Sequence, residues 1–489
     1  MSLFFPQSHA DYTRWLEQTI SFPRLRKKRR KILRCFSRMD LSSVDELLAV
    51  RFSKFGPRSY RPSDLLRSCL LAVRMHVTSI TKWVEALHDD PFCAALSGFQ
   101  QDAVPSVGTF YNFAARLWDA DSANVSPHVR PKKPVPKKPD KRGEKAACTE
   151  PTSMDELLDH WQCDPLSKPI PYWPLAAVFS LFLKRSCKEG LISADALSLA
   201  GDGTPVCTSA RQRKHRVCSC KVKGIEHCDC DRHYSQPDCD IGWDSSRSLY
   251  FNGYNLYLLT AADSSNDLPV FPLLVPASRH DSMAFIDAFF LFRMLFGPSF
   301  HVTELLLDSA HDAMPLYRYC KQVGITPFID LNARRSGKGT TVPKDSFHSD
   351  TDGTPICPAG KRMHRDGTEK ARERLKFRCP CIRRCSDGTK QCVCAEPCTD
   401  SKYGPVLHVP LAQNPRLYNT PSRGSKAWRK EYAKRTSAER ANKRIKIDFL
   451  LESGKHRSSR MWYFRLYTIL MLLHACAWKD SSAVPPHAA

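Results

Sequence analysis

The stretch between Ile192 and Ile329 constrains the fold most, because strand-like and helix-like segments alternate along it. Apolar runs of strand length cover residues 196–200, 254–260, 270–275, 303–307 and 326–329. Helical patterns cover residues 283–296 and 313–323. Three strands followed by a helix, a strand and a helix predict an α/β (α+β) domain.

The residues before this stretch predict an all-helical N-terminal domain, covering residues 1–120. A basic run extends from Arg24 to Arg34, and helices are expected to begin at Pro62, near Ser79 and after Pro105. Three short helices near a basic run are typical of helix-turn-helix modules that bind DNA. A helical packing domain without DNA contact is the alternative.

The charge of the chain points to a polyanionic partner. The 489 residues include 74 Lys and Arg against 50 Asp and Glu, a net charge of +24. Such a field attracts nucleic acid or an anionic membrane. Residues 121–150 are rich in Pro and Lys and predict a stiff basic linker. Residues 481–489 predict a disordered tail.

A membrane location is not expected. The N-terminal residues lack the basic segment and apolar run of a signal peptide. The longest apolar run, residues 461–478, contains Arg465 and His474, which favours a buried helix over a membrane span. We therefore expect a cytoplasmic protein.

Four polar residues near the C-terminus follow the spacing Tyr-x2-Arg-x3-Glu-x6-Lys, namely Tyr432, Arg435, Glu439 and Lys446. Their segment contains no Gly or Pro, so we predict a helix. At about 100° per residue the four side chains fall within an arc of about 60°. A carboxylate among cations on such a basic helix suits a metal ion next to phosphate better than it suits a protein core.

Two further carboxylates come directly after predicted strands. Asp202 follows residues 196–200 in the sequence AGDGTP, and Asp308 follows the run TELLL. Cleavage of phosphodiesters by two metal ions requires acidic ligands on rigid elements. With Glu439 these two residues form the predicted catalytic set. The competing carboxylates are Asp312, Glu452 and Asp263.

These motifs resemble those of DDE transposases of the insertion sequence family four type, which carry the Tyr-Arg-Glu-Lys signature. DGTP at Asp202 resembles the first aspartate motif, LLLDSAHDA at Asp308 the second, and the segment of Glu439 and Asn442 the third. His280-Asp281 resembles a family segment that shapes the site. The resemblance implies an RNase H-like catalytic domain over residues 151–480, with cysteine-rich insertions at about 207–239 and 335–425.

The resemblance also implies a function, DNA transposition, in which element ends are cleaved and joined to target DNA (DNA recombination). It implies that two Mg²⁺ (or Mn²⁺) ions are held by Asp202, Asp308 and Glu439. It implies that DNA phosphates are bound by Tyr432, Arg435 and Lys446. The expected partner is double-stranded DNA, both ends and target, held by a homodimer. The resemblance also implies a nucleoid-associated location in a prokaryotic cell. The alternatives are an inactive transposase-derived DNA-binding protein and an RNase H-like nuclease without strand transfer.

Twelve of the 21 cysteines crowd into two short windows. The predicted ligands in the first window are Cys218, Cys220, Cys228 and Cys230. Those in the second window are Cys379, Cys381, Cys392 and Cys394. In a large intracellular chain this crowding favours structural Zn²⁺ over disulfides. The Cys-x-Cys spacing departs from the usual zinc pattern, and reduced thiols or redox disulfides are the alternatives.

Overall fold

The computed structural model describes residues 4–20, 26–53, 55–125, 152–164, 170–211, 220, 222–225, 235–332 and 347–478. These residues form a mixed α/β protein that divides into two compact units. Unit 1 comprises residues 1–197, 202–301 and 437–489, and unit 2 comprises residues 198–201 and 302–436. Only residues 121–125 of the predicted linker are described, and the predicted tail lies outside the described residues.

The N-terminal part of unit 1 is helical, as predicted. Its helices are α1 (His9–Thr19), α2 (Lys27–Ser37), α3 (Ser42–Leu48), α4 (Pro62–Arg74), α5 (Ile80–Asp89), α6 (Pro91–Ser97) and α7 (Val107–Arg116). Pro62 occupies the first turn of α4, where its fixed φ favours a helix start. Ser79 caps α5, because its hydroxyl accepts a hydrogen bond from the backbone N–H of Lys82.

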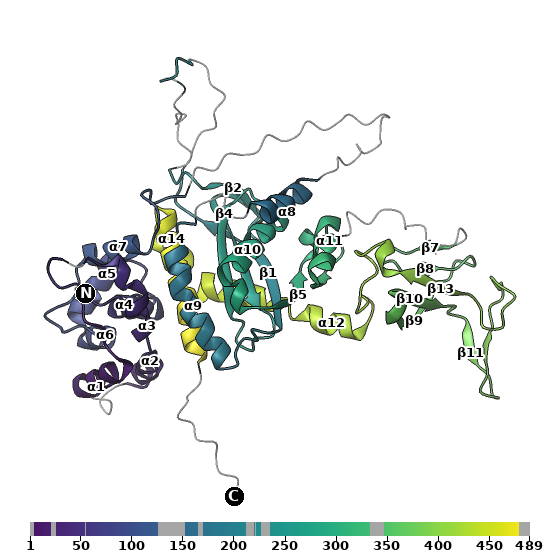
Figure 1. Ribbon diagram of the computed structural model, residues 1–489, viewed down its shortest axis with the longest axis horizontal. Helices are drawn as coiled ribbons and strands as arrows, with labels where there is room; N and C mark the ends of the chain where they lie inside the picture. Colours follow the sequence, from purple (N-terminus) through teal and green to yellow (C-terminus); the bar gives the residue numbers. More distant parts are fainter. Residues whose placement is uncertain are drawn as a thin grey trace, which may run out of the picture. The chain divides into compact units, whose positions relative to one another are not determined.

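The apolar run near the C-terminus forms α14 (Ser459–Ala477), which is a core helix of unit 1. It packs beside α9 (Trp173–Lys188) and also contacts α4 and α7 (Figure 1). Arg465, the charged residue inside the run, has a hydrogen-bond partner within the protein, since its Nη2 donates to Phe449 O at 2.9 Å. His474 Nε2 lies 2.8 Å from Pro269 O. The prediction of a buried helix is therefore confirmed.

Residues 281–299, which include α10 (Asp281–Phe296), have the length and composition to cross a membrane. This is weak evidence for a span, because the core helix of a folded domain passes the same test. In unit 1, α10 packs on β3 (Leu249–Ala261) and β4 (Pro269–Pro276), and α8 (Ser153–Cys163) packs on α10.

A mixed β-sheet carries Asp202 in one strand and leads directly into Asp308 after another, two of the three residues predicted to be catalytic. The hydrogen-bonded strand order is β2-β3-β1-β5-β6, with β4 paired to β3. The remaining strands are β1 (Leu197–Cys207), which contributes residues to both units, β2 (Asp240–Asp244), β5 (Val302–Leu307) and β6 (Thr326–Ile329). In unit 1, β3 pairs antiparallel with β2 and with β4. In unit 2, β5 pairs parallel with β6, with Leu305 opposite Pro327.

Unit 2 continues from β6 into a β-rich segment with its own core. After α11 (Met314–Val323) and β6, the strands are β7 (His348–Ser349), β8 (Pro355–Ile356), β9 (His364–Glu369), β10 (Arg374–Arg378), β11 (Ile382–Arg384), β12 (Lys390–Cys392) and β13 (Val406–Pro410). Strands β13, β10 and β9 form one antiparallel sheet. Its buried side chains include Leu375, Phe377, Leu407 and Val409.

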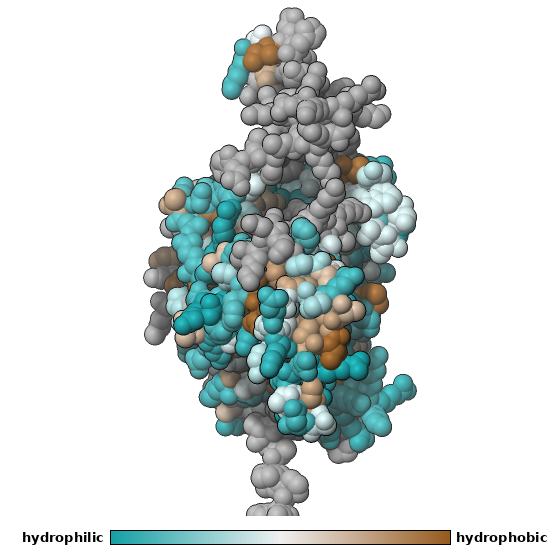
Figure 2. All heavy atoms as spheres, turned by 90° about the vertical axis from the view of Figure 1, so that its right-hand side faces the viewer, coloured by the Kyte–Doolittle hydropathy of each residue, from teal (hydrophilic) through white to brown (hydrophobic). Residues whose placement is uncertain are grey.

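The face of the molecule that is shown in Figure 2 is mostly hydrophilic, and its apolar side chains form only small areas. The apolar side chains of the sheet formed by β9, β10 and β13 are instead buried in the core of the β-rich segment.

Candidate active site

Asp202 of β1 meets helix α13 (Thr436–Lys443) in unit 1. Asn442 donates a hydrogen bond from Nδ2 to Asp202 Oδ2 at 3.0 Å. Asn442 is only 5% exposed, and its Oδ1 is a buried atom without a hydrogen bond in the described part of the chain. Glu439 lies one turn earlier on α13, and residues three apart share a helix face. The helix of Glu439 is therefore attached to the strand of Asp202.

Lys446, which was predicted to bind DNA, makes its contacts within unit 1. Its Nζ donates to Pro205 O at 2.5 Å and lies 3.4 Å from Glu452 Oε1. The Lys446 side chain is 15% exposed. Because Pro205 lies in β1 three residues after Asp202, Lys446 provides a second attachment between this strand and the segment after α13.

The continuous helix predicted around the four signature residues is not formed. Tyr432 lies in α12 (Lys426–Ala433), Glu439 in α13, and Lys446 in a π-helical turn (Arg444–Asp448). Thr436 Oγ1 donates to Ala433 O at 3.0 Å, the kind of local side-chain bond that competes with helix continuation. The common arc of about 60° is therefore wrong, since it assumes about 100° per residue throughout.

Gly203 leaves room for polar side chains beside β1 in unit 1. A Cβ at this position would stand 2.1 Å from Asp281 Oδ1 and 3.0 Å from Asn255 Oδ1. Asn255 of β3 donates from Nδ2 to Asp281 Oδ1 at 2.6 Å, and Asp281 begins α10. Because side chains alternate along a strand, Asp202 and this pair lie on opposite faces of β1. Asp281 thus braces the strand from the side opposite to α13.

We predict that Gly203→Ala lowers the free energy of unfolding by about 1–3 kcal/mol, because the new methyl group would overlap Asp281. Urea unfolding of the purified variant measures this. Gly108→Ala is the matched control, since a Cβ there would meet nothing closer than Ser106 Oγ at 3.7 Å, and Ala is favoured over Gly in helix α7. If Gly203→Ala unfolded with the same free energy as the wild type, the crowding at β1 would be contradicted.

Asp308 follows β5 in unit 2 and caps the next turn. Its Oδ1 lies 2.6 Å from His311 Nδ1 and accepts a hydrogen bond from the N–H of Ala310 at 3.1 Å. Burial raises the pKa of Asp308, but the hydrogen bonds from His311 and Ala310 and the charges of His311 and Arg435 outweigh it and hold the pKa below its ordinary value. Asp308 is therefore ionised near neutral pH, as a ligand of a hard cation must be.

Tyr432 and Arg435 share the neighbourhood of Asp308 in unit 2. The Tyr432 ring stacks on Trp428, with ring centroids 4.7 Å apart, and Arg435 Cζ lies 5.8 Å from the Tyr432 centroid. Burial raises the pKa of Tyr432 to about 12, with smaller contributions from Arg435, Asp330 and Asp308. The phenol is therefore neutral, and it can donate a hydrogen bond to a phosphate oxygen.

The predicted site residues thus fall into two groups. Unit 1 contains Asp202, Glu439 and Lys446, and unit 2 contains Asp308, Tyr432 and Arg435.

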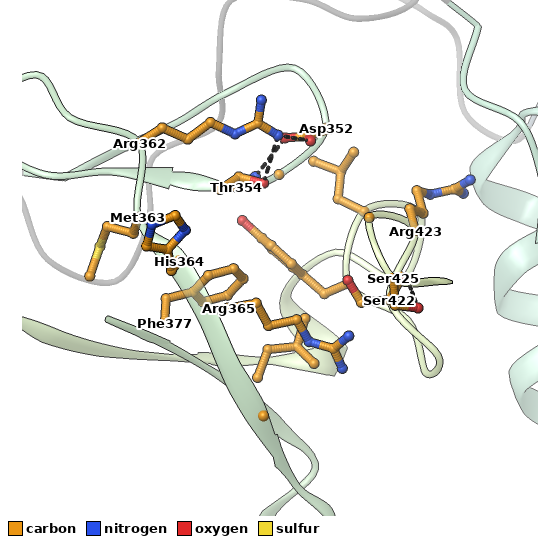
Figure 3. A pocket seen from close by; sticks show the side chains of 16 residues that line it. Asp352, Thr354, Arg362, Met363, His364, Arg365, Phe377, Ser422, Arg423 and Ser425 are labelled. Carbon is orange, nitrogen blue, oxygen red and sulfur yellow. Dashed lines mark hydrogen bonds and ion pairs between the residues drawn. The ribbon is translucent and has the colours of Figure 1, made fainter. Parts of the chain in front are cut away.

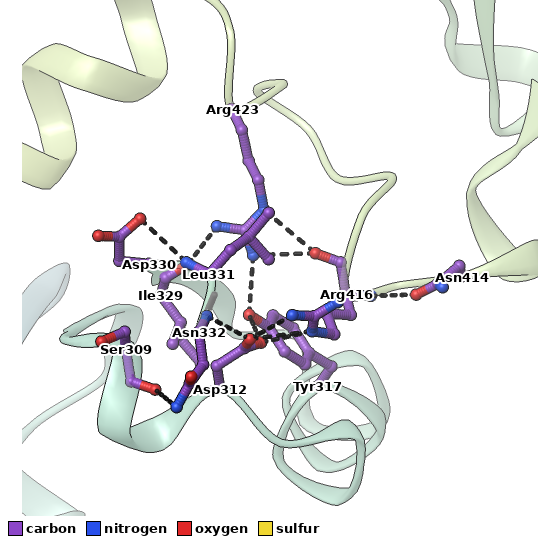
Figure 4. Close-up of polar contacts among 10 residues, drawn as sticks. All are labelled: Ser309, Asp312, Tyr317, Ile329, Asp330, Leu331, Asn332, Asn414, Arg416 and Arg423. Carbon is purple, nitrogen blue, oxygen red and sulfur yellow. Dashed lines mark hydrogen bonds and ion pairs between the residues drawn. The ribbon is translucent and has the colours of Figure 1, made fainter. Parts of the chain in front are cut away.

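Asp312, a competing carboxylate, is part of a buried ion pair. Its side chain is fully buried, and Arg416 Nη2 lies 2.6 Å from its Oδ2 (Figure 4). Tyr317 Oη donates to Oδ1 at 3.1 Å, and the N–H of Asn332 donates to Oδ2 at 2.7 Å. Both oxygens are thus engaged in holding unit 2 together, which removes Asp312 as a metal ligand.

Glu452, another competing carboxylate, also has partners within its own unit. Its Oε1 accepts a hydrogen bond from the N–H of Cys207 at 2.9 Å, and its Oε2 lies 3.6 Å from Arg247 Nη2. With Lys446 as a third partner, Glu452 holds the end of β1.

A basic cavity of about 580 Å³ in unit 2 was not predicted from the sequence. Arg362, Arg365 and Arg423 line it, and Phe377 belongs to its apolar wall (Figure 3). Leu375 lies in the same wall. Arg362 pairs with Asp350 and Asp352, and Arg423 donates to Tyr317 Oη. Arg365 Nη2 donates to Thr368 Oγ1 at 2.6 Å, and its buried Nε makes no hydrogen bond in the described part of the chain. The cavity can therefore receive an anionic group.

The cysteines of the second window stand in pairs. Cys379 Sγ and Cys392 Sγ are 3.8 Å apart. Lys361 Nζ lies 3.3 Å from Cys381 Sγ and 3.4 Å from Cys394 Sγ. In the first window, Cys220 is half-buried, and the other predicted ligands, Cys218, Cys228 and Cys230, lie outside the described residues.

No group of three or more His, Cys, Asp or Glu side chains that could hold a metal ion occurs within the described ranges. Zinc at the cysteine windows therefore stays a prediction, and elemental analysis of the purified protein would test it. Comparison of the chain with protein-family models, with curated proteins and with solved structures gave no match.

Proposed function

We propose that the protein is a DNA transposase that cleaves element ends and joins them to target DNA. The observation that carries this proposal is the hydrogen bond from Asn442 to Asp202, which attaches the helix of Glu439 to strand β1. The third motif of the resemblance is thereby linked to the first, although the two residues lie 240 positions apart. If α13 only packed against β1, apolar side chains could make the contact, and a half-buried carboxylate would not need to face a buried amide.

The donor chemistry of the proposed site fits divalent cations. Carboxylates and amide oxygens are the ligands that Mg²⁺ prefers, and Asn442 Oδ1 is a buried oxygen beside Asp202 without a hydrogen bond in the described chain. We propose Asp202, Asp308 and Glu439 as the ligands of two Mg²⁺ ions. When bound, such ions supply charge stabilisation to the attacking and leaving oxygens.

The protein's own residues position these ligands and the DNA. Asn442 and Lys446 attach α13 and the following turn to β1, and His311 orients the Asp308 carboxylate. Arg435 and Tyr432 are proposed to bind a DNA phosphate, through a guanidinium fork and a neutral phenol. The chain order of β1, β2, β3, β4, α10, β5 and α11 supports an RNase H-like catalytic domain, because it contains the expected strands, helix, strand and helix with β2 as one additional strand.

The test is to incubate the full-length protein with Mg²⁺ and double-stranded DNA that carries the flanking ends of the element. Cleavage at the ends and joined products are expected with Mg²⁺ or Mn²⁺, and neither is expected with EDTA. Cleavage without joining would favour the RNase H-like nuclease. Binding of the ends without cleavage would favour an inactive DNA-binding protein. A homodimer on paired ends is expected, and the mass of the purified complex measures it.

Helix α2 is the strongest candidate for a DNA-backbone contact in the N-terminal helices. Its exposed side chains include Lys27, Lys28 and Lys31. Replacing these three by Gln is predicted to lower the slope of log affinity against log salt by about 2–3, because each phosphate contact contributes about 0.9. Fluorescence anisotropy at several salt concentrations measures the slope. The control replaces exposed lysines on other helices of unit 1, namely Lys82, Lys184 and Lys188. An equal loss in both variants would contradict a contact at α2.

A further inference from the structure

Two thiols that are far apart in the sequence are in van der Waals contact in unit 1. Cys35 Sγ on α2 lies 3.8 Å from Cys476 Sγ in the last turn of α14, across 441 positions of sequence. Cys35 is half-buried, and Cys476 is exposed. Neither residue belongs to the two cysteine windows, and neither has a role in the proposed catalytic function.

The surroundings of the pair favour one thiolate and one thiol. The hydrogen bond from Cys35 lowers the pKa of Cys476 to about 7, against the opposing effect of partial desolvation, and the charges of Arg74 and Arg444 act in the same direction as Cys35. The same hydrogen bond, with burial, raises the pKa of Cys35. A thiolate is the nucleophilic form of cysteine, and an accessible thiolate beside a second thiol is the arrangement found in redox-sensitive cysteine pairs.

We infer that Cys35 and Cys476 are a modification site, at which a low-molecular-weight disulfide such as oxidised glutathione converts the two thiols into a reversible disulfide. The Cys476 thiolate attacks one sulfur of the small disulfide, so that a mixed disulfide forms and one small thiolate leaves. Cys35 then loses its proton and attacks the Cys476 sulfur, which releases the second small thiol. The protein loses two electrons and two protons, and the small disulfide gains them.

The disulfide would join the N-terminal helices to the C-terminal helix of the same unit. Since α2 also exposes Lys27, Lys28 and Lys31, the joined helix is the one proposed to contact DNA. The link closes a loop of more than four hundred residues, and long loops lose the most unfolded-state freedom when closed. This inference does not depend on the proposed function, because it concerns thiol chemistry that any folded sample can report.

The experiment equilibrates the full-length protein in glutathione buffers of increasing oxidation, blocks free thiols with iodoacetamide, and maps the peptides by mass spectrometry. A peptide that links Cys35 to Cys476 is expected, together with a rise of roughly 5 °C in the melting temperature of the wild-type protein. Reduction with dithiothreitol should reverse both. Cys35→Ser is expected to leave a stable mixed disulfide at Cys476.

Cys163→Ser is the matched control, because Cys163 is an exposed thiol of unit 1 on α8. It should leave the linked peptide and the temperature shift unchanged. The inference would be overturned if no linked peptide were recovered under conditions in which Cys163 has already formed a mixed disulfide. A melting temperature that rises equally in Cys476→Ser and in the wild type would also overturn it.

Discussion

Replacing any one of the three proposed metal ligands by its amide is expected to abolish cleavage of element ends. Asp202→Asn, Asp308→Asn and Glu439→Gln each keep the size of the side chain but remove the negative charge that would hold Mg²⁺. We expect the rate of strand cleavage to fall by about 10³-fold or more, which corresponds to about 4 kcal/mol of lost transition-state stabilisation. Gel analysis of labelled DNA in single-turnover reactions measures this rate.

The control for this prediction is Asp195→Asn, which makes the same chemical change at an exposed position of unit 1. This variant should cleave at the wild-type rate. Circular dichroism and retained binding to the DNA ends should show that the three ligand variants remain folded. If one of the three variants cleaved at the wild-type rate, its residue would be removed from the proposed site. If all three did, the mechanism would be contradicted.

Removing the buried carboxylate of Asp312 is expected to cause the largest loss of stability. Asp312→Ala leaves the Arg416 guanidinium, whose side chain is 13% exposed, without its anionic partner, and it also removes the acceptor of Tyr317 and Asn332. Breaking one half of a buried ion pair typically costs about 3–5 kcal/mol. The free energy of unfolding, measured by urea titration with a probe in unit 2, reports the loss.

Two comparisons make this prediction specific. Glu373→Ala removes the partner of Lys321 in an exposed pair of the same unit, with side chains 57% and 70% exposed and 3.9 Å between charged atoms, so it should cost less than about 1 kcal/mol. The double variant Asp312→Leu with Arg416→Met should be more stable than Asp312→Ala, because it leaves no buried charge without a partner. If Asp312→Ala costs no more than Glu373→Ala, the ion pair does not hold unit 2 together.

Local patterns were sufficient to predict many of the elements. The apolar runs at residues 254–260 and 270–275 became β3 and β4, and the helical pattern at residues 313–323 became α11. These elements are predictable because their periodicity and their turn residues lie within a few positions of one another. Strand β2 was missed, because Asp240, Gly242 and Asp244 occupy its buried positions, and Asp and Gly are residue types that are depleted in strands.

The helix of the signature residues shows where such reasoning fails. Its composition predicts one unbroken helix, yet α12, α13 and a π-helical turn divide it. The π-helical turn carries Lys446, whose ammonium group bonds to Pro205 O, a partner 241 positions earlier in the chain. Helix propensity is a weak preference that such tertiary contacts override.

The sequence alone determined the acidic and basic residues on which the proposed metal-dependent chemistry rests, the basic charge, and the alternation of strands and helices. Only the tertiary structure decided which polar residues meet. It attached Asn442 to Asp202, engaged Asp312 with Arg416, and brought Cys35 to Cys476. Periodicity and propensity act over a few residues, whereas these contacts join positions that are more than a hundred residues apart. They arise when packed elements bury apolar faces together, and the polar groups left between those elements must then find partners.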